Sequence, residues 1–142
     1  LDQLTKHFAY IYLRTLPSQS LPIINGVLHL TYVENRGAAF SILQNRRMFF
    51  IVITAIFIVF AVYYLIKNRN GNKLLNFSIS LVLAGAIGNL IDRVINGYVI
   101  DFVDFRLINF AIFNIADCAD VIGCILLAYY LIFIDGKKQE SK

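Results

Sequence analysis

Long apolar runs alternate with short polar segments along this chain. One run extends over residues 48–66 without a charged side chain, and a second, interrupted by small and polar residues, extends over 74–91. Runs of this length are typical of helices that cross a bilayer. The polar segment between them is short and contains Gly71. The pattern therefore predicts two transmembrane helices joined by a tight turn.

The last apolar run, over residues 121–134, is too short to cross a membrane by itself. At about 1.5 Å per helical residue, it cannot span a hydrocarbon core of about 30 Å. A helix long enough to cross must extend over 115–134 and include Asp117 and Asp120. Charged residues in such positions are costly and usually functional. We therefore predict a spanning helix with two carboxylates in its outer turns.

The first segment, residues 1–16, is mostly apolar but carries four interrupting side chains, Asp2, Lys6, His7 and Arg14. It lacks the basic start, apolar middle and small-residue end of a cleavable signal peptide. We interpret it as the remnant of a first spanning helix whose beginning is absent. Asp2 and Lys6 are four residues apart, so they can form an ion pair on one helix face.

The segment 17–47 has no helical pattern. Two apolar runs, 21–24 and 27–33, flank an Asn-Gly pair, which is typical of a β-hairpin. A small sheet with aliphatic and aromatic faces can lie on a membrane surface and hold an extended peptide at its edge. An ordinary surface hairpin fits these residues equally well.

Composition and charge place these elements in a membrane. Of the 142 residues, 58% are hydrophobic and only 15% are charged, which is more apolar surface than a soluble domain of this size can bury. The net charge of +4 comes largely from the turn 67–73 and the tail 135–142. The positive-inside rule assigns both to the cytoplasm, although Arg36, Arg46 and Arg47 put positive charge on the other side.

This orientation leaves the segment 17–47 and the loop 92–114 outside the membrane. It also gathers five carboxylates at the outer face: Asp92, Asp101, Asp104, Asp117 and Asp120. The predicted fold is a single, mainly α membrane domain over 1–142. It consists of a four-transmembrane-helix bundle, with the first helix truncated, and a small extracytoplasmic β-sheet cradle.

Asp101 and Asp117 are the strongest candidates for chemistry. Two carboxylates brought together without water cannot both ionise easily, so they share a proton. Such a pair can activate water and protonate a carbonyl or leaving amine. Asn114 precedes Asp117 by the spacing of a helix cap. The alternative is that these aspartates only cap helices or pair with Arg93 and Arg106.

Other chemistries have little support in the sequence. The two histidines, His7 and His29, form no Ser-His-Asp arrangement, and no metal-binding motif or glycine-rich phosphate loop occurs. Cys118 and Cys124 lack metal-ligand spacing and are interpreted as packing residues. A small proton-coupled transporter is the main alternative function, since carboxylates in a membrane also mark ion paths. A non-catalytic scaffold would leave the clustered aspartates unexplained.

Five short motifs occur in order along the chain: residues 1–6 (LDQLTK), 35–40 (NRGAAF), 88–93 (GNLIDR), 97–102 (GYVIDF) and 113–117 (FNIAD). Together they closely resemble the motifs of the bacterial lipoprotein signal peptidases (signal peptidase II), a family of intramembrane aspartyl proteases. The chain departs from the common pattern at Ala111, where many members have proline, and at Cys118, where serine is frequent.

The resemblance implies four transmembrane helices, an outward-facing β-cradle and a catalytic dyad formed by Asp101 and Asp117. Members of the family cut a prolipoprotein just before its diacylglyceryl-modified cysteine. The implied substrate-binding residues are Asn35, Gly37, Ala38, Asn89, Arg93 and Asn114, and the implied structural supports are Asp2, Lys6 and Asp92.

The resemblance also implies the surroundings in which the chain works. The expected partners are the diacylglyceryl-prolipoprotein substrate and membrane lipids, with no nucleic acid, no metal and no cofactor. We expect a monomer that crosses the bacterial cytoplasmic (inner) membrane several times, with its active site at the outer face.

Overall fold

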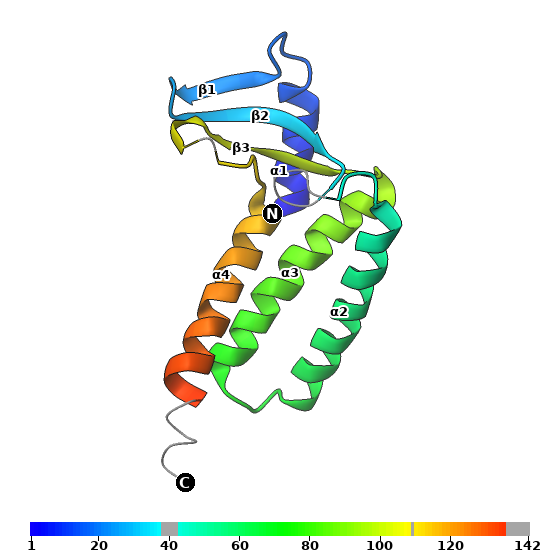
Figure 1. Ribbon diagram of the computed structural model, residues 1–142, viewed down its shortest axis with the longest axis vertical. Coiled ribbons are helices and arrows are strands. Elements are labelled where there is room, and N and C mark those ends of the chain that lie inside the picture. Colours follow the sequence, from blue (N-terminus) through cyan, green and yellow to red (C-terminus); the bar gives the residue numbers. More distant parts are fainter. Residues whose placement is uncertain (38–42, 109, 136–142) are drawn as a thin grey trace.

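Three long helices form the body of the protein (Figure 1). The computed structural model describes residues 1–37, 43–108 and 110–135. Within these ranges, three helical segments are long and apolar enough to cross a membrane. They are α2 (Arg47–Lys67), α3 (Lys73–Ile95), and α4 (Ile115–Tyr129) with its π-helical continuation to Asp135.

The α3 helix is longer than the apolar pattern predicts. It continues past residue 91 to Ile95, so Asp92 and Arg93 lie in its last turns and not in the outer loop. The helix ends where the N–H groups of Asn96 and Gly97 both bond to the Asp92 carbonyl. Gly97 has a φ of +86°, the left-handed conformation that commonly terminates helices. Polar residues can therefore extend a helix beyond its apolar run.

Small residues bring α3 and α4 close together. A Cβ atom added to Gly123 of α4 would lie 2.9 Å from the Ser78 carbonyl oxygen of α3. A Cβ atom added to Gly88 of α3 would lie 3.0 Å from the Ala116 Cβ atom of α4. This close approach holds the two helices side by side.

The first segment of the chain is a short helix beside the sheet. It comprises α1 (Asp2–Phe8) and a π-helical stretch, Ala9–Leu13, so that it ends before residue 16. Ala9 and Leu13 pack against Tyr32, Ile100 and Phe102 of the sheet in a small buried core.

The sheet has three antiparallel strands in the order β1 (Ser20–Ile24), β2 (Leu28–Asn35) and β3 (Val99–Phe105). The hairpin turn is where the Asn-Gly pair predicts it, and Gly26 adopts a φ of +71°. The third strand corrects the prediction, because it comes from the segment 92–114 that was expected to be a loop. The cradle therefore combines residues from two distant parts of the chain.

Alternation along β3 points Asp101 away from the small core. Ile100 and Phe102 face the first helix, and successive side chains of a strand point to opposite faces. Asp101 therefore faces the ends of α3 and α4. The sheet lies at one end of the bundle, while the α2–α3 turn lies at the other (Figure 1).

Candidate active site

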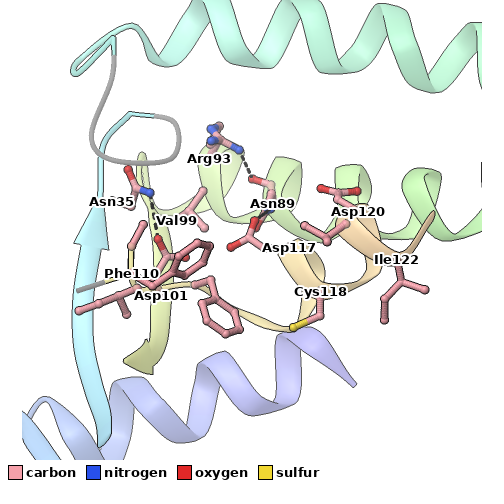
Figure 2. Close-up of a pocket in the computed structure, with 14 residues that line it drawn as sticks. Asn35, Asn89, Arg93, Val99, Asp101, Phe110, Asp117, Cys118, Asp120 and Ile122 are labelled. Carbon is pink, nitrogen blue, oxygen red and sulfur yellow. Dashed lines mark hydrogen bonds between the residues drawn. The ribbon is translucent and has the colours of Figure 1, made fainter. Parts of the chain in front are cut away.

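Asp101 is held on both carboxylate oxygens by side-chain amides, of which the bond from Asn35 is drawn in Figure 2. Asn114 Nδ2 donates to Oδ1 at 2.6 Å, and Asn35 Nδ2 donates to Oδ2 at 2.9 Å. The residue is only 2% exposed. The two amides fix the orientation of the carboxylate without neutralising its charge.

Burial and, to a smaller extent, the nearby charge of Asp117 raise the pKa of Asp101 from its usual value to about 6. The hydrogen bonds from Asn35 and Asn114 oppose this rise because they favour the charged form. Asp101 therefore gains and loses its proton much closer to neutral pH than an ordinary aspartate does.

Asp117 is fixed by the start of α4. It forms a capping box with Asn114: the Asn114 side chain accepts from the Asp117 N–H at 3.0 Å, and Asp117 Oδ2 accepts from the Asn114 N–H at 3.1 Å. The other oxygen accepts a hydrogen bond from Asn89 Nδ2 at 2.8 Å. The capping alternative thus describes part of the environment of Asp117.

Asn114 contacts both aspartates and is completely buried. Its Nδ2 atom donates to Asp101 and, at 3.2 Å, to Asn89 Oδ1, while its Oδ1 accepts from the Asp117 N–H. A single amide therefore connects the carboxylate of β3 to the first turn of α4. The expected pairing of these aspartates with arginines is absent from the described ranges, where Arg106 instead contacts Asp104 at 2.9 Å.

A buried lysine supports this amide network from the side of α1. Lys6 is 1% exposed, and its Nζ atom contacts Asp2 at 2.9 Å, Asp92 at 3.1 Å and Asn89 Oδ1 at 2.9 Å. The expected Asp2–Lys6 ion pair is thus part of a larger cluster that also joins α3.

The two carboxylates of this cluster also bind the backbone. Asp2 Oδ1 accepts from the Ala116 N–H of α4 at 2.9 Å, and Asp92 Oδ2 accepts from the Ile100 N–H of β3 at 3.0 Å. The cluster therefore ties α1, the sheet, α3 and α4 together.

Arg93 closes the opposite side of the site. Its guanidinium donates to the Asn89 carbonyl at 3.3 Å and the Gly37 carbonyl at 3.1 Å, and lies 4.9 Å from the Phe50 ring centre. The Gly37 N–H in turn donates to Asn35 Oδ1 at 2.9 Å. Ala38, another expected substrate-binding residue, lies outside the described residues.

A cavity of about 480 Å³ lies beside the two aspartates. It is lined by five of the predicted residues, Asn35, Asn89, Arg93, Asp101 and Asp117. Asn114 and Gly37 are behind this wall. The remaining lining side chains are mostly apolar, among them Val99, Phe110, Ile112, Phe113, Val121 and Ile122. A cavity of this kind suits a substrate with a large apolar part and one polar reacting group.

Asp120 also lines the cavity, and the sequence analysis gave it no role beyond membership of the outer acidic cluster. Its position three residues after Asp117 was the available signal, since residues at this spacing share a helix face. Within the described ranges, no group of three or more His, Cys, Asp or Glu side chains is arranged to hold a metal ion.

This chain is similar to known proteins in both sequence and fold. Residues 1–133 match the family model described as signal peptidase (SPase) II. The lipoprotein signal peptidase of Caldanaerobacter subterraneus subsp. tengcongensis is 52% identical over 136 residues, which cover 96% of this chain and 91% of that protein. The lipoprotein signal peptidase of Clostridioides difficile is 45% identical, with coverage of 98% and 92%.

Two solved structures, each titled as a bacterial membrane enzyme determined by the in meso method, share the fold. The one at 2.3 Å resolution superposes with a TM-score of 0.84 at 40% identity, covering 92% of this chain and 80% of that chain. The other, at 1.9 Å, gives a TM-score of 0.79 at 41% identity, with coverage of 94% and 86%.

Proposed function

This chain belongs to the signal peptidase II family, and from this premise we propose that it is an aspartic endopeptidase that removes the signal peptide from diacylglyceryl-modified prolipoproteins. The observation that carries the aspartic mechanism is the joint attachment of Asp101 and Asp117 to Asn114, beside one cavity. The two residues come from different elements, β3 and α4, and meet at the end of the bundle that carries the sheet.

In the proposed reaction, one carboxylate is ionised and the other carries a proton. The ionised group takes a proton from water, whose oxygen bonds to the carbonyl carbon that precedes the lipid-modified cysteine, while the protonated group donates to the carbonyl oxygen. The tetrahedral intermediate then collapses and the C–N bond breaks. The cysteine nitrogen takes the proton that the first carboxylate removed from water, and the second carboxylate takes back a proton from a hydroxyl group of the intermediate. The pKa of Asp101, near 6, supports a group that acts in turn as acid and base.

The surrounding amides supply positioning. Asn35, Asn89 and Asn114 hold the two carboxylates by hydrogen bonds, so that little reorganisation is needed when charge develops. In this proposal Asn35, Asn89 and Arg93 also bind substrate from the cavity wall, whereas Asn114 contributes through the aspartates. Gly37 and Ala38 leave room for the lipid-bearing peptide. Asp2, Lys6 and Asp92 act as structural supports.

The proposed setting is the cytoplasmic membrane, with the sheet and the two aspartates at the outer face. The basic α2–α3 turn at the opposite end of the bundle supports this orientation. The substrate lipid would fix the scissile bond at the depth of the carboxylates, and such positioning supplies part of the rate. The proposed working unit is a monomer. The proton-coupled transporter is set aside because the family is a peptidase family.

The test is cleavage of a precursor peptide with a diacylglyceryl-modified cysteine, followed by mass spectrometry of the products. We expect release of the signal peptide immediately before the cysteine and no cleavage of the unmodified peptide. Asp101→Asn and Asp117→Asn should each lower cleavage by about 10²–10⁴-fold while the protein stays folded, which is the usual contribution of a general acid–base group.

Asp104→Asn is the matched control for these variants. Asp104 is on the same strand as Asp101 but pairs with Arg106 at 2.9 Å and does not line the cavity. Burial opposes its ionisation, yet hydrogen bonds from Arg106 and Thr31 lower the pKa of its carboxyl. The variant should therefore keep near-normal activity. Normal cleavage by Asp101→Asn or Asp117→Asn would contradict the aspartic mechanism.

A further inference from the structure

Asp120 is a third carboxylate in the cavity, and the proposed reaction does not use it. It lies on α4 one turn beyond Asp117 and lines the cavity together with Asn89 and Arg93 (Figure 2). The chain leaves space for it on the neighbouring helix, because a Cβ atom added to Gly85 of α3 would collide with Asp120 Oδ1. A charged side chain at this depth of a spanning helix is expensive.

The described residues leave Asp120 without an ion pair. Its Oδ1 atom is buried and has no hydrogen-bond donor in bonding geometry there. The Asp120 carboxyl group as a whole still interacts with the Ala86 backbone and with the charges of Arg93 and Asp117. The obvious partner would be Arg93. However, the guanidinium of Arg93 is directed to the Asn89 and Gly37 carbonyls and stacks on a phenylalanine ring.

The position of Asp120 along α4 indicates which residues of the substrate it faces. Because α4 runs from the sheet toward the other end of the bundle, Asp120 is farther from the sheet than Asp117 by about 4.5 Å, at about 1.5 Å per helical residue. An extended peptide advances about 3.3 Å per residue. With the scissile bond at the two aspartates, Asp120 therefore faces the first or second residue on the membrane side of that bond. This is the end of the signal peptide.

We propose that Asp120 is a specificity-determining residue, which accepts a hydrogen bond from a serine or threonine hydroxyl in the last two residues of the signal peptide. The other residues of α4 that line the cavity near it, Cys118, Val121 and Ile122, are apolar or weakly polar. A small side chain with one donor therefore fits this part of the cavity.

This inference rests on the proposed function and is tested with matched lipid-modified precursors. Each pair carries serine or alanine at the first or the second position before the cysteine, and a further pair carries the change at the fifth. Because a hydrogen bond to a charged group is worth about 1.5–3 kcal/mol, we expect the wild-type kcat/KM to favour serine about tenfold or more at one of the two near positions. At the fifth position the ratio should be about one.

Two variants connect this preference to Asp120. Asp120→Ala should reduce the serine-to-alanine ratio to about one, mainly by slowing the serine precursor. Asp120→Asn, which keeps a neutral acceptor, should give an intermediate ratio. Ile125→Ala, a lipid-facing residue of the same helix that does not line the cavity, should keep the wild-type ratio.

A wild-type ratio near one at both positions would overturn the inference, and so would an unchanged ratio in Asp120→Ala. If both Asp120 variants stay folded but lose activity equally toward serine and alanine precursors, Asp120 contributes to the reaction itself and not to the choice between precursors. That result also overturns the inference. Failure of the wild-type protein to cleave any precursor would instead contradict the proposed function.

Discussion

Asn114 Nδ2 donates a hydrogen bond of 2.6 Å to Asp101 Oδ1, which links the start of α4 to the third strand of the sheet. The same side chain caps α4 by accepting from the Asp117 N–H. One residue therefore has two separable tasks. It stabilises the helix terminus through its oxygen, and it orients the carboxylate of Asp101 through its nitrogen.

Replacing Asn114 by serine or alanine should separate these tasks. Serine keeps a cap oxygen but is too short to reach Asp101, whereas alanine removes both contacts. We expect both variants to lose at least about tenfold in kcat/KM, because the positioning of one reacting carboxyl is lost. Only Asn114→Ala should lose a further ~1 kcal/mol of stability through the missing cap. Cleavage rates and thermal unfolding in detergent measure the two effects, and wild-type activity in Asn114→Ser would contradict this assignment.

The spanning helices of this fold could be predicted from the sequence because their signal is local. An uncharged run such as 48–66 requires a helix in a bilayer regardless of what surrounds it, and the structure places α2 there. The turn around Gly26 is equally local, because it depends on a left-handed φ at one residue.

The third strand could not be predicted in the same way. Val99–Phe105 is interrupted by two aspartates, so it lacks a uniform apolar face, and its partner is β2, far back in the chain. Pairing with β2, from Leu28 with Phe105 to Asn35 with Val99, makes the segment a strand. Contacts between distant residues, such as Lys6 with Asp92, could not be predicted from the sequence for the same reason.

Lys6→Met should be strongly destabilising. Asp2 and Asp92 would then share a buried region without their cation, and removal of one partner of a buried ion pair costs about 3–5 kcal/mol. Lys67→Met is the matched control, because Lys67 is exposed at the end of α2 and should change stability by no more than about 0.5 kcal/mol. Chemical unfolding in detergent compares them. If the two variants are equally stable, the buried cluster does not support the fold.

A second substitution tests the electrostatic origin of that effect. Lys6→Met combined with Asp92→Asn removes one of the two unpaired charges, and the amide oxygen can still accept from the Ile100 N–H, as Asp92 does at 3.0 Å. The double variant should be more stable than Lys6→Met alone. If it is less stable, the loss comes from packing of the lysine stem and not from unpaired charge.

The stability of the protein should depend on pH through Asp101. Its pKa is raised to about 6 by burial and by the charge of Asp117. Between about pH 4 and pH 6 the folded protein therefore holds a proton that the unfolded chain has released, so its free energy of unfolding falls as pH rises through this window. At about 1.4 kcal/mol per pKa unit, the loss is about 1–3 kcal/mol.

Asp101→Asn should remove this dependence and be inactive. Its amide nitrogen can donate but not accept, so it also loses one of the two hydrogen bonds that Asn35 and Asn114 donate to Asp101. Asp104→Asn should be less stable than wild type at pH 7–8, because the pKa of Asp104 is lowered by Arg106 and Thr31 against the effect of burial. Its ionised form stabilises the fold above the unfolded pKa. Thermal unfolding of the three proteins between pH 4 and 8 distinguishes them. A wild-type curve that rises through the lower part of this range, with no difference in Asp101→Asn, would contradict the electrostatic assignment.

The contact between α3 and α4 should tolerate no side chain at Gly123. An added Cβ atom would lie 2.7 Å from Val82 Cγ2 and 2.9 Å from both the Ser78 carbonyl oxygen and the Val82 nitrogen. Two of these three atoms belong to the backbone, so rotation of a side chain cannot relieve the clash, and the helices must separate. We expect Gly123→Ala to lower the free energy of unfolding by about 1–3 kcal/mol.

The same substitution should also lower activity, because Asn89 of α3 donates to Asp117 of α4 across the same interface. Ile125→Ala, which shortens a lipid-facing side chain of α4, should change both properties far less. Equal effects of the two substitutions would show that close helix packing does not hold the aspartates in register.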